Sequence, residues 1–130
     1  MGIIHKVGAI ILDNKKILVG KKKEKFIIPG GRLEKGENNI ECLRRELNEE
    51  FRVELVSSKY FGTFDDEAAL DPGMTIHMDV YLTSIRGTPV ASSEITEMRF
   101  IDSKNSERIK LGSILEKFVI PELARKKMID

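Results

Sequence analysis

The sequence predicts an α/β sandwich, in which helices cover a mixed β-sheet. Three observations favour this fold class: strand-like runs flank one amphipathic segment, that segment (residues 38–51) has helical spacing, and a second helical stripe follows near residue 120. The 130 residues have the length of one ordinary domain, and no repeat or linker interrupts them. We therefore expect residues 1–130 to form a single domain.

The first third of the chain carries strand and turn signals. Residues 7–12 form an apolar run that stops at the turn-forming pair 13–14, and a second apolar run follows at 17–19. This order predicts a β-hairpin. Residues 26–28 are expected to form a further short strand, after which the glycine pair 30–31 is expected to turn the chain.

The strongest helical pattern lies in residues 38–51. Asn38 is a favourable N-cap, and Glu41, three positions later, completes the signature of a capping box. The apolar positions recur at helical spacing and form one face, made of Ile40, Leu43 and Leu47. A helix that buries this face against a sheet fits the predicted sandwich.

The second half of the chain predicts three more strands and a helix. Residues 53–64 and 75–84 read as long strands, and 97–102 as a short one. The two long strands are separated by an acidic loop that ends in a Pro-Gly turn, and substrate gating and solvation explain its acids equally well: Asp65, Asp66, Glu67 and Asp71. The stripe at 115–123 predicts a C-terminal helix that its proline kinks or restarts.

Charge balance and cysteine count exclude several classes of protein. Lys and Arg total 22 against 21 Asp and Glu, and this near-neutrality argues against a nucleic-acid coat protein. The single cysteine, Cys42, excludes an internal disulfide and fits a reducing compartment. The apolar run 7–12 is too short to span a bilayer. We expect a cytoplasmic protein with no membrane partner and no stable nucleic-acid partner.

Three glutamates of the predicted helix share one sector of its surface. At about 100° per residue, Glu46, Glu49 and Glu50 occupy a sector roughly 100° wide. Carboxylates placed so closely repel one another, and a hard, oxygen-seeking cation such as magnesium removes that repulsion. A solvated charged face is the alternative, but Gly31, Glu37 and Arg45 stand at spacings that such a face does not require.

Residues 31–53 resemble the Nudix box, whose pattern is G-x5-E-x7-R-E-U-x-E-E-x-G-U with U an aliphatic residue. Every fixed position matches except one, because Arg52 stands where the family has its second glycine. That glycine normally ends the helix in a left-handed conformation. Arg52 must therefore tolerate this conformation, at a cost on the order of 1 kcal/mol, or the helix must end differently.

The resemblance implies a Nudix-type α/β/α sandwich and a metal-dependent enzyme that hydrolyses the diphosphate linkage of a nucleoside-diphosphate-linked substrate. The catalytic residues implied by the matched positions are Glu37, Arg45, Glu46, Glu49 and Glu50. The implied ligands of magnesium, for which manganese is a substitute, are Glu46, Glu49, Glu50 and the carbonyl of Gly30. Which glutamate acts as the base is left open.

Outside the Nudix box, a few residues are weaker candidates. Many relatives place another carboxylate on a later strand, and Glu97, ahead of Glu94, is the candidate metal ligand here. Phe26, Lys23 and Arg32 are candidate substrate-binding residues. Burial in the core is the alternative for the phenylalanine, and solvation is the alternative for the charged side chains.

The resemblance leaves the substrate open. We expect a small-molecule nucleotide, first a nucleoside triphosphate, oxidised or not, that is cut as by a pyrophosphohydrolase. Hydrolysis of ADP-ribose or a nucleotide sugar is an alternative that the same motif permits. A non-catalytic Nudix module that senses a nucleotide is the alternative from another class, and the intact glutamates argue against it. A homodimer is also left open.

Overall fold

The structure is a computed structural model that describes residues 2–68 and 72–130, and these residues form two sheets. One of the two sheets is mixed. Its strand order is β5-β1-β7-β6; β1 runs parallel to β7, and the other neighbours are antiparallel. The strands are β1 (Gly2–Ile10), β5 (Gly30–Arg32), β6 (Glu54–Glu67) and β7 (Met74–Arg86). The mixed sheet predicted from the sequence is therefore confirmed.

The second sheet is antiparallel and contains the predicted hairpin. Its strands are β2 (Leu12–Asp13), β3 (Lys16–Lys22), β4 (Lys25–Ile27) and β8 (Ile95–Ile101). The β2–β3 turn places Asn14 and Lys15 at positive φ, 54° and 59°, which matches the twist of a tight hairpin. The β3–β8 ladder shifts register between Lys21 and Lys22.

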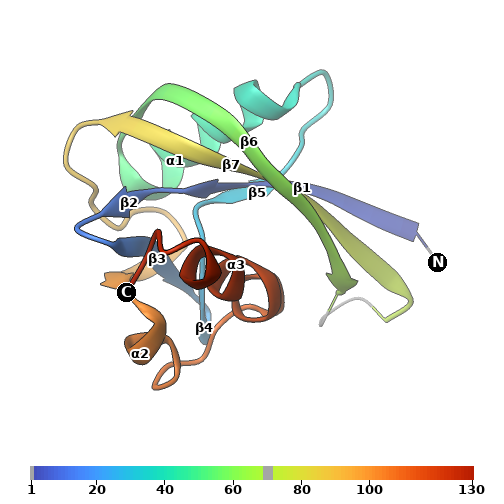
Figure 1. The fold of residues 1–130 in the computed structure, drawn as a ribbon. Helices are drawn as coiled ribbons and strands as arrows, with labels where there is room; N and C mark the ends of the chain where they lie inside the picture. The colour runs from blue at the N-terminus through green and yellow to red at the C-terminus, as the bar shows by residue number, and fades with distance from the viewer. Residues whose placement is uncertain (1, 69–71) are drawn as a thin grey trace.

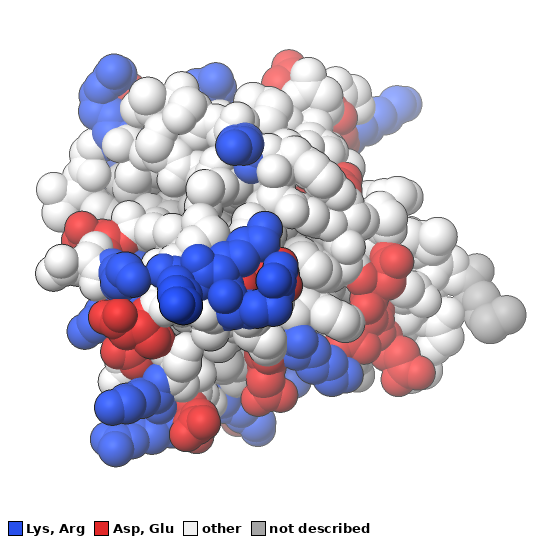
Figure 2. All heavy atoms as spheres, viewed as in Figure 1, with Lys and Arg blue, Asp and Glu red and all other residues white. Residues whose placement is uncertain are grey.

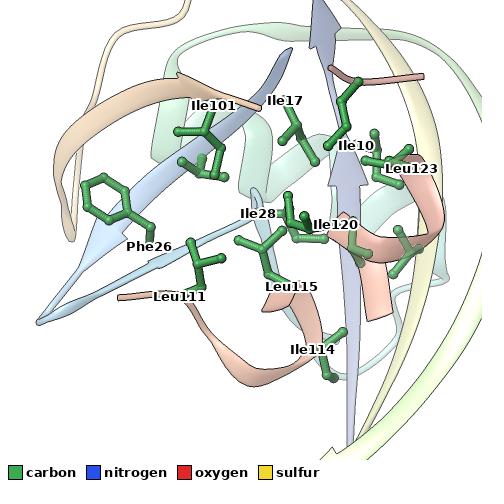
Figure 3. Packing of buried hydrophobic residues seen from close by; sticks show 14 residues of the cluster. Ile10, Ile17, Phe26, Ile28, Ile101, Leu111, Ile114, Leu115, Ile120 and Leu123 are labelled. Atoms are coloured by element: carbon green, nitrogen blue, oxygen red, sulfur yellow. The ribbon is translucent and has the colours of Figure 1, made fainter. Parts of the chain in front are cut away.

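Helices cover both faces of the mixed sheet (Figure 1). Helix α1 (Asn39–Phe51) lies on one face, and the C-terminal segments η1 (Leu115–Val119) and α3 (Ile120–Arg125) lie on the other. Each layer has its own buried cluster: Leu43 and Leu47 of α1 belong to one, and the residues drawn in Figure 3, Leu115 and Leu123 among them, form the other. The fold is the predicted α/β/α sandwich.

The ends of α1 follow the local sequence. The Asn38 side chain accepts from the Glu41 N–H at 2.9 Å, and the Glu41 carboxylate accepts from the Asn38 N–H at 3.0 Å, so the predicted capping box is confirmed. At the other end Arg52 adopts the left-handed conformation, with φ 56° and ψ 37°. The arginine thus takes the geometry expected of the glycine that it replaces.

Two predicted loops are strands in the structure. The pair Gly30–Gly31 was expected as a turn, but it belongs to β5, which pairs with β1 through Gly8↔Gly30 and Val7↔Gly31. Residues 65–67 were expected in an acidic loop, but they continue β6, because cross-strand pairs as far as Glu67↔Thr75 extend the ladder. Of that expected loop, Asp71 lies outside the described residues, and the Pro-Gly turn at 72–73 is present.

The sequence predicts that Pro121 kinks or restarts the C-terminal helix, and in the structure a new α-helical segment begins beside it, at Ile120. A five-residue π-helical stretch, η1, precedes the proline, and α3 follows with Pro121 in its first turn. Proline lacks an N–H and clashes with the preceding turn, so a widened turn before it is a physical consequence. A four-residue helix, α2 (Ser103–Ser106), was not expected from the sequence. None of the described helices is long and apolar enough to cross a membrane.

The face that carries α3 mixes both signs of charge (Figure 2). Basic groups form a strip across the middle of this face, and acidic groups lie beside and below it. This distribution agrees with the net charge of +1 for the whole chain.

Candidate active site

The strand β5 and the helix α1 approach each other at the two glycines. The Gly30 N–H donates to Oε1 of Glu50 at 2.9 Å. Gly30 has φ 145°, and a Cβ on it would lie 2.0 Å from the Val7 carbonyl oxygen. A Cβ on Gly31 would lie 2.7 Å from Oε2 of Glu46. Glycine at position 30 therefore lets β5 lie against the β1 backbone, and glycine at position 31 leaves room for the Glu46 carboxylate.

Glu50 is a buried carboxylate with little compensation. The residue is 4% exposed, and its carboxylate accepts a hydrogen bond from the Gly30 N–H. Burial raises the pKa of Glu50 to about 7, against the lowering effect of the Gly30 N–H, and the charge of Glu46 raises it further. A cation placed at this carboxylate would favour its ionised form. Such an environment is typical of functional sites.

Glu46 and Glu49 lie on the same side of the helix but differ in exposure. The Glu46 side chain is 14% exposed, and burial raises its pKa although the neighbouring Arg45 lowers it. The Glu49 side chain is 53% exposed, and its Oε2 lies 3.4 Å from Nη1 of Arg45. Glu46 therefore faces the strand beside Glu50, while Glu49 reaches solvent.

Arg45 ties the loop before the helix to the helix itself. Its guanidinium donates to both oxygens of Glu37, with Nε–Oε2 at 2.7 Å and Nη2–Oε1 at 2.9 Å. It also pairs with Glu46 and donates to the Arg32 carbonyl. The hydrogen bond from Arg45, together with the Glu34 N–H, lowers the pKa of Glu37 to about 2. Glu37 and Arg45, two of the matched positions of the motif, thus form an ion pair.

Lys22 and Glu94 form a second charged pair near the carboxylates. The Lys22 Nζ lies 2.9 Å from Oε2 of Glu94. The charges of both residues act on the pKa of Glu50. Glu97, the first candidate from the sequence, instead pairs with Arg99 across an exposed part of β8. Of the two candidates, Glu94 is therefore the one whose charge acts on a helix carboxylate, Glu50.

The sequence did not single out Lys22, although its neighbour Lys23 is one of the predicted substrate-binding residues. The signal lay in strand alternation, because Lys22 shares a strand face with Gly20. A Cβ on Gly20 would lie 2.7 Å from the ring of Phe51, so this face of β3 meets the end of α1. A lysine two residues further along the same face is directed to the same end of the helix.

The candidate substrate-binding residues lie apart from one another. Phe26 is 4% exposed and belongs to the core drawn in Figure 3, with the Arg99 guanidinium 5.1 Å from its ring centroid. Lys23 is exposed in the turn between β3 and β4. Arg32 is exposed at the end of β5. Phe26 is therefore a core residue, which is the alternative to a substrate-binding role.

The carboxylates fit a hard divalent cation as a partial ligand set. Within residues 2–68 and 72–130, no three His, Cys, Asp or Glu side chains converge as a complete metal cage. Magnesium is ordinarily bound by one or two carboxylates, with water and substrate phosphates as its other ligands. Glu46 and Glu50 provide two desolvated carboxylates whose pKa values are raised, and a cation would relieve that cost. The donor set therefore suits magnesium together with a phosphorylated substrate.

Comparison with known proteins gives one family and many similar folds. The profile of the NUDIX domain matches residues 4–119. No curated protein matches the sequence. The solution structure of the E. coli ORF135 protein is 26% identical, with a TM-score of 0.76 over 96% of this chain and 94% of that chain.

Two further structures share the fold at lower identity. A NUDIX hydrolase from Nitrosomonas europaea is 18% identical, with a TM-score of 0.79 over 95% of this chain and 90% of that one. A MutT NUDIX hydrolase from Burkholderia pseudomallei is 22% identical, with a TM-score of 0.70 over 76% of this chain and 82% of that one. Both likenesses concern the arrangement of strands and helices.

Proposed function

Because the chain belongs to the Nudix hydrolase family, whose members act on pyrophosphate bonds, we propose that it is a magnesium-dependent nucleoside triphosphate pyrophosphohydrolase. The observation that carries the proposal is the buried Glu50 carboxylate, held by the Gly30 N–H beside Glu46. A MutT protein from Burkholderia pseudomallei and one from Bacillus halodurans are among the similar structures, which supports a MutT-like member of the family.

Glu46 and Glu50 are the proposed magnesium ligands, and manganese is the expected substitute. The chemistry expected of the bound ion is polarisation of the phosphoryl oxygens and neutralisation of charge on the leaving phosphate. Two further ligands, the Gly30 carbonyl and Glu97, stay predictions. The Gly30 contact that the structure contains is its N–H to Glu50. Glu94, the second candidate from the sequence, ranks ahead of Glu97 in this proposal, because its charge acts on Glu50.

Glu49 is the proposed general base. Its side chain is the most exposed of the three box glutamates, at 53%, so water reaches it. In this scheme water attacks one phosphorus, its proton passes to Glu49, and the bond between that phosphorus and the leaving phosphate oxygen breaks. Arg45 holds Glu49 through an ion pair of 3.4 Å and anchors the helix to the preceding loop through Glu37. Arg45 and Glu37 therefore act as positioning residues.

Two exposed basic residues, Lys23 in the β3–β4 turn and Arg32 at the end of β5, are the proposed contacts for the substrate phosphates. Lys23 and Arg32 are both exposed and carry side chains long enough to reach a bound anion. Phe26 stays a candidate only for shaping the wall behind the site, because its ring is buried in the core.

A substrate panel tests the proposal. The purified protein would be incubated with magnesium and nucleoside triphosphates, oxidised triphosphates, ADP-ribose and dinucleoside polyphosphates, and the products would be separated. We expect a nucleoside monophosphate and pyrophosphate from a triphosphate, with turnover abolished by chelation. Preference for ADP-ribose would shift the assignment to a nucleotide-sugar pyrophosphatase. Turnover of no diphosphate with magnesium or manganese would overturn the enzymatic proposal in favour of a sensor.

A further inference from the structure

We propose that the Lys22 ammonium is an internal counter-ion of the catalytic carboxylates, which competes with the divalent metal ion until the substrate's phosphates take over its charge. Lys22 is thus a positioning residue that weakens metal binding until nucleotide is bound. The inference rests on the proposed metal site at Glu46 and Glu50.

The backbone directs Lys22 toward the end of α1. Lys22 is the last residue of β3, on the strand face shared with Gly20, which lies against Phe51. The partner of β3 changes from Glu97 opposite Lys21 to Ile95 opposite Lys22, which leaves one residue of β8 unpaired. A bulge of this kind bends a strand and redirects side chains beside functional sites.

The ammonium of Lys22 pairs with Glu94, and the charges of Glu50 and Glu46 act on it. Its Nζ lies 2.9 Å from Oε2 of Glu94; the Lys22 side chain is 36% exposed and the Glu94 side chain 70%, so solvent screens the acid more than the lysine. Burial lowers the pKa of Lys22, but the hydrogen bond and charge of Glu94, with the charges of Glu50 and Glu46, raise it above its ordinary value. The same interactions act in reverse, since Lys22 lowers the pKa values of Glu46 and Glu50.

A cation fixed at this place has two consequences. In the metal-free protein it offsets repulsion between the carboxylates and so stabilises the fold. Toward a divalent ion it acts as a like charge and weakens binding. Phosphates of a bound nucleotide would neutralise Lys22, which removes the penalty, so metal and nucleotide should bind more tightly together than either does alone.

Manganese binding without nucleotide tests the inference, because the ion can be titrated directly by calorimetry or electron paramagnetic resonance. Lys22→Met removes the charge and keeps the length of the side chain. We expect it to bind manganese about fivefold more tightly than the wild type, the order expected for one nearby unit charge in partly screened surroundings. Lys22→Arg should retain wild-type affinity.

Two control variants isolate the ammonium. Lys21→Met removes a neighbouring charge on the opposite face of β3, and its manganese affinity should equal that of the wild type. Glu94→Gln, alone and combined with Lys22→Met, separates loss of the ammonium from release of the Glu94 carboxylate. The double variant should still bind manganese more tightly than Glu94→Gln. In the absence of metal, Lys22→Met should melt at a lower temperature than the wild type.

The outcomes separate this inference from the proposed function. Manganese affinity in Lys22→Met that equals or falls below that of the wild type would overturn the role of Lys22 and leave the metal site intact. A second readout is the change in manganese affinity on adding a non-hydrolysable nucleoside triphosphate, which should be larger in the wild type than in Lys22→Met. Absence of manganese binding in every protein, with and without nucleotide, would overturn the metal site itself.

Discussion

The carboxylates at the two ends of the same sequence motif have pKa values shifted in opposite directions. At the loop end, Glu37 receives two hydrogen bonds from Arg45, and its pKa falls to about 2. At the helix end, burial raises the pKa of Glu50 to about 7, with one backbone N–H as its donor. Both residues are fixed positions of the Nudix pattern.

The difference separates a structural role from a chemical one. The charge of Glu37 is already balanced inside the protein, so its main effect is to hold the loop and α1 together. The charge of Glu50 is balanced only in part, so folding leaves it ready for an external cation. An acid that is costly to bury and still held in place points to the reaction site.

The largest expected effect concerns turnover. Glu50→Gln and Glu46→Gln remove the charge that a hard cation needs, and each should reduce kcat by roughly 10³-fold or more. Glu37→Gln should cost about tenfold, because it only frees Arg45, and it should lower the melting temperature. Rates of product release and melting curves for each variant check this. A loss in Glu37→Gln as large as that in Glu50→Gln, with the fold intact, would erase the distinction between the two ends.

Stability in metal-free buffer should depend on pH through Glu50. Its folded pKa of about 7 lies above the ordinary value of 4.5, so the folded protein binds more protons than the unfolded chain between these values. The stabilisation is fully present below about pH 4.5 and is lost as pH rises through 7, by up to about 3 kcal/mol. Glu37 has the opposite sign, because its lowered pKa contributes stability that is present above about pH 4.5 and is lost as pH falls toward 2.

Denaturant unfolding at pH 5 and pH 8 with chelator measures this effect. The wild type should be less stable at pH 8, and Glu50→Gln should reduce the difference, because a glutamine does not titrate. An equal difference in both proteins would assign the pH dependence to other groups.

The later carboxylates extend the comparison beyond the motif. Glu94 acts on Glu50 through its charge, whereas Glu97 pairs with Arg99. We expect Glu94→Gln to lower kcat/KM by about tenfold and Glu97→Gln to change it by less than about twofold. Steady-state kinetics on the best substrate decides the order, and a larger effect at Glu97 would restore the expectation drawn from the sequence.

The smallest expected effect lies at the end of α1. Arg52 is held at φ 56°, where glycine costs less, so Arg52→Gly should stabilise the protein by up to about 1 kcal/mol. The loss of the hydrogen bond from Arg52 Nε to Ser92 Oγ, at 2.9 Å, will reduce that gain. Denaturant midpoints of the two proteins measure the net change, and a clear destabilisation would mean that the side chain contributes more than the backbone costs.

Much of the fold was predictable because the signals are local. The capping box at Asn38, the turn at Asn14 and the restart at Pro121 depend on neighbours in sequence, and each is present in the structure. The prediction of a turn at the glycines of β5 was wrong: a glycine pair is typical of turns, but this pair lies in a strand. Their requirement here comes from distant contacts, with Val7 for Gly30 and with Glu46 for Gly31.

The candidate site was predictable in its helix and not in its surroundings. Helical spacing alone puts Glu46, Glu49 and Glu50 in one sector. It does not say which of them is buried, since burial depends on how β5 packs against α1. The pairing of Lys22 with Glu94 was harder still to predict from the sequence, because it depends on the register of β3 against β8 and on the bulge in that ladder.

The most direct test of the account is the effect of magnesium on thermal stability without substrate. An ion that binds only the folded protein raises the melting temperature by mass action. We predict that millimolar magnesium raises the melting temperature of the wild type and of Glu54→Gln, a control at an exposed carboxylate of β6, but not that of Glu50→Gln. An equal rise in wild type and Glu50→Gln, or no rise in the wild type with magnesium or manganese, would contradict the claim that Glu50 holds the metal ion.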